Sequence, residues 1–103
     1  MMSNFTKGEW FAKREGQSTV YIECRIGGGW LQEVAACGPT ANGSEEQEAN
    51  AKLIAAAPDL LEALQDLKRE IILSDVDMDY IESHFKPWLD KARAAITKSG
   101  GEA

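Results

Sequence analysis

The chain has 103 residues, a hydrophobic fraction of 44% and a formal net charge of −6. This length supports one domain with a modest core, which we expect to span residues 1–103. The acidic balance has the wrong sign for contacting phosphate backbones, so we expect no nucleic-acid partner.

No segment predicts a membrane partner or export. The longest purely apolar stretch, Leu53 to Ala57, falls far short of the roughly 20 residues that a membrane-spanning helix needs. The N-terminus, Met1 to Thr6, lacks the basic start and apolar core of a signal peptide. We therefore expect a cytoplasmic protein. In that reducing compartment, Cys24 and Cys37 are expected to serve as small buried hydrophobic residues.

Residues 7–37 predict a three-stranded antiparallel meander. A short strand, about Glu9 to Lys13, follows Gly8. Apolar residues then alternate with polar ones from Thr19 to Ile26, and a similar alternation runs from Trp30 to Cys37. The glycines at 27–29 supply the positive φ angles that a hairpin turn needs.

A hairpin centred on Gly28 fixes a register for the second and third strands. It places Ile26 opposite Trp30, Cys24 opposite Gln32, Ile22 opposite Val34, and Val20 opposite Ala36. In this register Cys37 points to the other face of the sheet from Cys24, so we predict that the two thiols do not form a disulfide.

Residues 38–43 are rich in turn formers and predict a linker, after which the apolar period changes to that of a helix. Ser44 and Gln47 have the spacing of a capping box. Pro58 predicts a kink or a restart near Ala57. A stripe with alternating steps of three and four residues predicts a face packed along its length on another helix, widened by Ile54 and Leu61: Asn50, Leu53, Ala57, Leu60, Leu64, Leu67 and Ile71.

A second helix is predicted after Ser74 and Asp77, which have the spacing of a helix cap. Pro87 should kink this helix, and Gly100 and Gly101 should end it. The predicted hairpin spans residues 44–98, with a flexible tail at 99–103. The fold class is therefore α+β, a β-meander followed by a kinked helical hairpin. The residues expected to face inward are Met78, Ile81, Phe85, Leu89, Ala92 and Ile96.

The sequence predicts neither catalysis nor a metal site. Asp75, Asp77 and Asp79 have the spacing of a calcium loop, but Tyr80 and Lys86 stand where that loop requires Gly and Glu. His84 is the only histidine, and no signature of nucleophilic catalysis surrounds it or the cysteines. We expect a non-enzymatic protein without a cofactor.

The block from Glu48 to Leu64, EANAKLIAAAPDLLEAL, resembles a helix found in small phage and prophage accessory proteins. Such proteins tend to begin with a Gly-x-Trp strand, and Gly8-Glu9-Trp10 is similar to it, although Glu9 stands where members often have Pro. The sheet-then-helices layout is also similar to that of phage anti-Thoeris sponges. That resemblance implies sequestration of a cyclic ADP-ribose-type immune signal.

Asn50 is polar at an otherwise apolar stripe position. It could contact a ligand, set the register of a dimer, or lie at the frayed start of the stripe. The residues expected to bind a small nucleotide enclosed between two copies of the chain are Asn50, Arg25, Trp30, Thr40 and Asn42.

Two alternatives to signal sequestration remain. Residues 44–82 carry eleven acidic and three basic side chains, so this segment could antagonise a basic site on a host protein. The chain could also be a structural or regulatory prophage component. The long stripe and the small size predict a homodimer or higher homo-oligomer.

Overall fold

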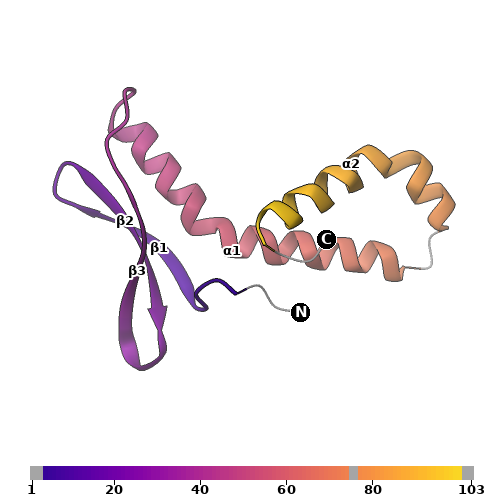
Figure 1. Ribbon diagram of the computed structural model, residues 1–103, viewed down its shortest axis with the longest axis horizontal. Coiled ribbons are helices and arrows are strands. Elements are labelled where there is room, and N and C mark those ends of the chain that lie inside the picture. Colours follow the sequence, from indigo (N-terminus) through magenta and orange to yellow (C-terminus); the bar gives the residue numbers. More distant parts are fainter. Residues whose placement is uncertain (1–3, 75–76, 101–103) are drawn as a thin grey trace. The chain divides into compact units, whose positions relative to one another are not determined.

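The computed structural model describes residues 4–74 and 77–100. A three-stranded sheet comes first and two helices follow, as Figure 1 shows. The predicted α+β class is confirmed. Among the described residues, none of the helices combines the length and the apolar character needed to cross a membrane.

The sheet is an antiparallel meander in the order β1-β2-β3. The strands are β1 (Glu9–Glu15), β2 (Thr19–Ile26) and β3 (Trp30–Cys37), with a 3₁₀ turn, η1 (Gly27–Gly29), between the last two. Gly28 and Gly29 have φ angles of 80° and 81°, so the turn uses the left-handed conformations that glycine adopts without strain. The first strand is two residues longer than expected.

The predicted register is correct only near the turn. Ile26 pairs with Trp30 and Cys24 with Gln32, but a β-bulge between Ile22 and Glu23 shifts the pairing by one residue. Ile22 therefore pairs with Ala35, and Val20 pairs with Cys37. The expected pairs Ile22–Val34 and Val20–Ala36 are wrong because one extra residue of β3 is inserted at the bulge.

The bulge also moves Cys37 to the face that was not expected. Directly paired residues share a face, so Cys37 lies on the same side of the sheet as Val20 and Cys24. Both thiols are nevertheless free. Their pairing positions on β2 are four residues apart, about 13 Å along the strand, which is beyond the reach of a disulfide.

The two helices are α1 (Ser44–Leu73) and α2 (Met78–Lys98). Each continues through its internal proline, Pro58 in α1 and Pro87 in α2. The second helix is capped by Asp77, whose side chain accepts a hydrogen bond from the Asp79 backbone N–H at 2.9 Å. Asp75 and Gly101 lie outside the described residues.

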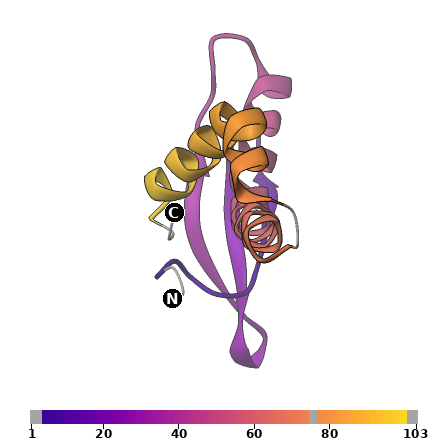
Figure 2. The same cartoon turned by 90° about the vertical axis from the view of Figure 1, so that its right-hand side faces the viewer.

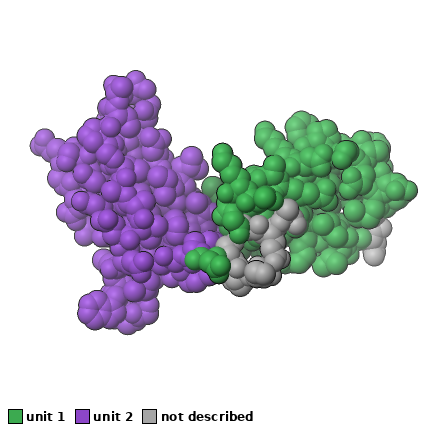
Figure 3. Space-filling view, in the orientation of Figure 1, with its two compact units in different colours: residues 1–4, 59–103 green, residues 5–58 purple. Residues whose placement is uncertain are grey.

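The chain divides into two compact units, coloured in Figure 3. Unit 2 is Phe5–Pro58, and it contains the sheet and the first half of α1. Unit 1 is Met1–Asn4 with Asp59–Ala103, and it contains the second half of α1 and all of α2. The division therefore falls at Pro58, inside α1.

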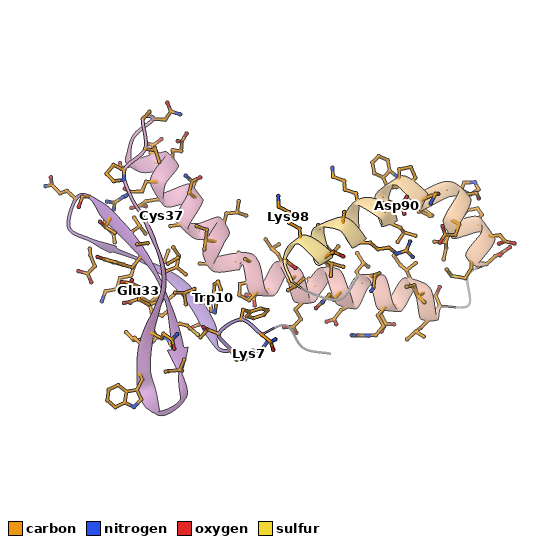
Figure 4. All side chains as sticks on the ribbon, viewed as in Figure 1. Lys7, Trp10, Glu33, Cys37, Asp90 and Lys98 are labelled. Carbon is orange, nitrogen blue, oxygen red and sulfur yellow. The ribbon has the colours of Figure 1, made fainter. Side chains whose placement is uncertain are left out.

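The core of unit 2 is formed where the first half of α1 packs on one face of the sheet. Val20, Ile22 and Ala51 are fully buried there. Half-buried apolar side chains from β1, from β3 and from the helix surround them: Trp10, Ala12, Val34, Ala35, Cys37 and Ala55. Figure 4 labels Trp10 on β1 and Cys37 at the end of β3. The small Ala51 and Ala55 allow the helix to approach the sheet closely.

A buried amide joins this helix to β1, to β3 and to the turn between β1 and β2. Gln47 is only 2% exposed. Its Nε2 donates to the carbonyl oxygens of Ser18 at 2.9 Å and Cys37 at 2.8 Å, and its Oε1 accepts from Arg14 Nη2 at 3.0 Å. The predicted capping box is wrong, because the Gln47 side chain reaches across to the sheet instead of back to the helix start.

Arg14 extends this network to the helix surface. Its Nε donates to Glu48 Oε1 at 2.7 Å. The hydrogen bond from Arg14, and then its positive charge, lower the pKa of Glu48 below the ordinary value. A carboxylate with a lowered pKa contributes stability above its unfolded pKa and loses that contribution as the pH falls through the folded pKa. Because the Glu48 side chain is 44% exposed to solvent, this contribution is screened by salt.

The buried face of α1 also differs from the predicted one. Gln47 and Ala51 are buried, whereas Asn50 is exposed and Leu53 is 64% exposed. Further along, Leu60 and Leu67 are 55% and 59% exposed. The expected stripe is therefore largely solvent-facing, because the Gln47–Ala51–Ala55 face is the one that fits the sheet.

We expect Gln47→Ala to destabilise the protein. The substitution removes the donor to two partly buried carbonyl oxygens, and a lost hydrogen bond in a buried setting costs about 1–3 kcal/mol. Urea denaturation should therefore show a lower midpoint for Gln47→Ala. The control is Gln32→Ala, at an exposed position of β3, which should shift the midpoint little. Equal midpoints for the two variants would contradict the anchoring role of Gln47.

Gly8→Ala should also be destabilising, which gives a physical reason for the Gly-x-Trp element. Gly8 has a φ of +133°, and a Cβ there would collide with the Arg25 carbonyl oxygen and lie 2.8 Å from Cys24 Sγ. The matched control is Gly38→Ala, where a Cβ meets nothing within 4 Å. Thermal unfolding should separate the two variants, and a native-like midpoint for Gly8→Ala would contradict the close approach.

Candidate functional site

Three of the residues expected to bind a ligand lie at the entry to α1. Asn50 is exposed on the helix surface. Thr40 Oγ1 donates to the Gly43 carbonyl oxygen at 3.2 Å, and Asn42 Nδ2 donates to Glu46 Oε2 at 2.7 Å. The Thr40 and Asn42 side chains therefore stabilise the turn before the helix, which is a local structural role.

The other two lie on either side of the β2–β3 turn, Arg25 near the end of β2 and Trp30 at the start of β3. Arg25 pairs with Glu9 at 3.2 Å, and its guanidinium lies 4.7 Å from the Phe11 ring centre. Trp30 is 71% exposed. In the strand pairing, Trp30 lies opposite Ile26, and Arg25 lies opposite Leu31. The Trp30 and Arg25 side chains therefore point to opposite faces of the hairpin.

Unit 2 alone therefore does not bring the five residues together. The length of β3 separates Trp30 from the linker pair, and Arg25 points away from Trp30. A nucleotide bound by all five would need a further surface, such as a second copy of the chain.

Unit 1 contains a different candidate site, an apolar groove between its two helices. Figures 1 and 2 show α2 returning beside the second half of α1. Between the two helices lies a cavity of about 520 Å³, within the range of binding sites. We call it the α1–α2 groove. Its lining is Leu64, Leu67, Lys68, Glu70, Ile71, Ser74, Ile81, Phe85, Trp88, Leu89 and Ala92.

Helical spacing in each helix produces this lining. On α1, Leu64, Leu67 and Ile71 follow steps of three and four, which place them on one side of the helix. On α2, Ile81, Phe85 and Trp88 follow steps of four and three, and Ala92 continues them. Each helix thus contributes one apolar stripe to the groove.

The packing of unit 1 is incomplete. Ile81, Leu89 and Ile96 are buried as expected, but Phe85 is 47% exposed and Met78 is 38% exposed. Leu64, expected to be buried along the stripe, is half-buried in the groove wall. Trp88 is 66% exposed. Trp88 is not among the residues expected to face inward, and the groove was not expected from the sequence, although the steps from Phe85 to Trp88 and Ala92 continue one stripe.

The groove offers little polar chemistry. Lys68 and Glu70 are its charged lining residues, and Ser74 Oγ donates to the Ile71 carbonyl oxygen at 2.7 Å. Ion pairs on the helix surfaces, Arg69–Asp66 and Lys86–Asp90, hold other charges in place. Within residues 4–74 and 77–100, no cluster of three or more His, Cys, Asp or Glu side chains could hold a metal ion.

Comparison with known families gives the context for this site. The model of the family described as Salmonella phage P22 protein Y8K6 matches residues 1–103. The chain belongs to this family. No curated protein and no solved structure matches the chain significantly. The family match confirms that the chain is a phage protein. The resemblance to anti-Thoeris sponges stays a prediction.

Asn50→Ala tests whether the exposed amide has a structural role. Because Asn50 is exposed and lies outside the buried face of α1, we expect the free energy of unfolding to change by about 0.5 kcal/mol or less. Ala51→Asn, at the neighbouring buried position, should by contrast be strongly destabilising. Chemical denaturation of both variants measures the difference, and a large loss at Asn50 would contradict its placement.

Proposed function

We propose that this phage protein is a non-enzymatic accessory protein that acts by binding a protein partner through the α1–α2 groove. The observation that carries the proposal is the lining of the groove, which is apolar along both helices. Such a surface suits the apolar face of a helix, whose side chains fill a groove at spacings of three and four residues. It is poorly suited to a phosphate-bearing ligand.

The exposure of the rim supports a protein partner over a small molecule. Pockets for small ligands enclose most of the ligand, with a few polar groups that fix its orientation. Here Leu67 and Trp88 remain 59% and 66% exposed at the rim. Exposed Trp and Leu beside a groove are typical of surfaces that become buried only when another protein docks.

Signal sequestration is the second candidate. It is favoured by Trp30, whose 71% exposed indole is available for stacking on a base. Signal sequestration requires a second copy of the chain to complete the nucleotide site, because one chain does not bring Arg25, Trp30 and Asn50 together. Calorimetric titration with cyclic ADP-ribose-type nucleotides tests it. Binding that is lost in both Trp30→Ala and Asn50→Leu would favour this candidate over the groove.

Antagonism of a basic host protein is a form of the main proposal. The segment 44–82 has a net charge of −8, and Glu45, Glu62 and Glu70 are exposed on α1. Long-range attraction would accelerate encounter with a basic partner, whereas the groove would supply most of the affinity. Charge reversal of Glu62 should then slow association more at low salt than at high salt.

The proposal predicts that Leu67→Glu abolishes the biological effect of the protein without unfolding it. The new charge would lie in the groove, and Leu67 is already 59% exposed, so the fold should tolerate it. The matched control is Leu53→Glu, at a position 64% exposed on the unit 2 part of α1. A phage lacking the gene would be complemented with each variant.

Plating efficiency on a panel of bacterial hosts is the measurement. We expect the Leu53→Glu variant to complement like the wild type and the Leu67→Glu variant to resemble the deletion. Circular dichroism should show equal helix content for both proteins. Full complementation by the Leu67→Glu variant would overturn the proposed role of the groove.

A further inference from the structure

We infer that the partner in the α1–α2 groove is a second copy of this chain, so that two helical hairpins form a four-helix bundle. This inference rests on the proposed role of the groove as a protein-docking site, and it names the occupant. Four observations on unit 1 support it: its small core, the spacing of its apolar residues, the area that it exposes and the charges on its rim.

The core of unit 1 is too small for the unit to be stable by itself. Among the described residues of unit 1, only Ile81, Leu89 and Ile96 are buried. The buried cluster of Val20, Ile22 and Ala51 belongs to unit 2. A pair of helices can bury only one side of each helix. Units of about 40 residues usually need a disulfide, a metal or oligomerisation to be stable.

The spacing of the lining residues is that of a helical bundle. On α1 the lining residues Leu64, Leu67 and Ile71 follow steps of three and four, and Leu60 precedes them by four. On α2 the lining residues Ile81, Phe85, Trp88 and Ala92 follow steps of four, three and four. Such a pattern keeps an apolar seam along helices that cross at about 20°, as they do in four-helix bundles. The groove is bounded by one seam from each helix, and a second hairpin would supply two more.

Unit 1 exposes apolar area of the size that a stable interface needs, and three of the exposed side chains, Leu67, Phe85 and Trp88, line the groove itself. Eight large apolar or aromatic side chains of unit 1 are between 38% and 70% exposed: Leu60, Leu67, Ile72, Leu73, Met78, Tyr80, Phe85 and Trp88. At on the order of 100 Å² each, they expose roughly 800 Å². A standard interface buries about 800 Å² on each partner.

The charges on the rim are self-complementary. Lys68 and Glu70 both line the groove, and neither forms an ion pair among residues 4–74 and 77–100. They are two residues apart on α1, so their side chains do not face each other within one chain. A two-fold axis through the groove would place Lys68 of each copy near Glu70 of the other, since the same patch is used on both sides.

The first test is the oligomeric state of the full chain and of two tryptophan variants. Sedimentation velocity at micromolar concentration should give twice the 11.3 kDa chain mass. Trp88→Ala should raise the dimer dissociation constant at least about 30-fold, as truncation of an aromatic hot spot does. The matched control, Trp30→Ala, removes an equally exposed tryptophan outside the groove and should leave the constant unchanged.

The second test exchanges the rim charges. Lys68→Glu alone and Glu70→Lys alone should each weaken the dimer, because every cross-copy pair would become repulsive. The double variant should restore affinity to within a few-fold of the wild type. Such rescue reports contact between copies, because the two side chains do not meet within one chain.

The outcomes separate this inference from the proposed function. A monomeric wild-type chain, or a dimer insensitive to both Trp88→Ala and the charge exchange, would overturn the inference. If the Leu67→Glu variant still lost complementation in that case, the groove would bind a different protein and the proposed function would stand. The opposite result is also informative. If the wild-type chain dimerises through the groove, and the Leu67→Glu variant is monomeric but still complements fully, the inference stands and the proposed function is overturned.

Discussion

The fold of the N-terminal half depends on one buried amide. Gln47 lies in the first turn of α1 and contacts β1 through Arg14, the turn before β2 through the Ser18 carbonyl, and the end of β3 through the Cys37 carbonyl. A buried amide lowers stability unless its N–H donors and its carbonyl acceptor form hydrogen bonds. In Gln47 both Nε2 and Oε1 form them. This requirement fixes how the helix is rotated over the sheet.

That rotation decides which apolar residues of α1 remain available. With Gln47 and Ala51 against the sheet, the stripe that begins at Leu53 points away from the core. Small alanines suffice to cover the sheet, so the leucines of the same helix are free for another purpose. In unit 1 the continuation of this stripe forms one wall of the groove. The exposure of Leu53 is thus a consequence of how the sheet is covered. The exposed Leu67 lines the groove of unit 1, which supports a role in association.

A phage accessory protein that acts by association has no need of a catalytic cluster or a cofactor. The features that distinguish this chain are an apolar groove, an acidic helical segment and exposed tryptophans on both units. A second copy in the groove would complete the small core of unit 1, whereas the exposed Trp30 and the acidic surface would stay accessible to another ligand or partner. Self-association and recognition would then use different parts of the chain.

The sequence by itself determined the elements and their order, because these depend on local periodicity and on turn chemistry. The alternation from Thr19 to Ile26, the glycines at 27–29 and the helical spacing after Ser44 act over a few residues, and the structure has the corresponding strands, turn and helices. Only the tertiary structure decided the register beyond the bulge and the buried face of α1. Both depend on contacts between distant segments: an extra residue in β3 reversed the predicted face of Cys37, and Gln47 found its partners 10 and 29 residues away. The groove was likewise undetermined, since a stripe with steps of three and four residues specifies an apolar face but does not specify which surface covers it.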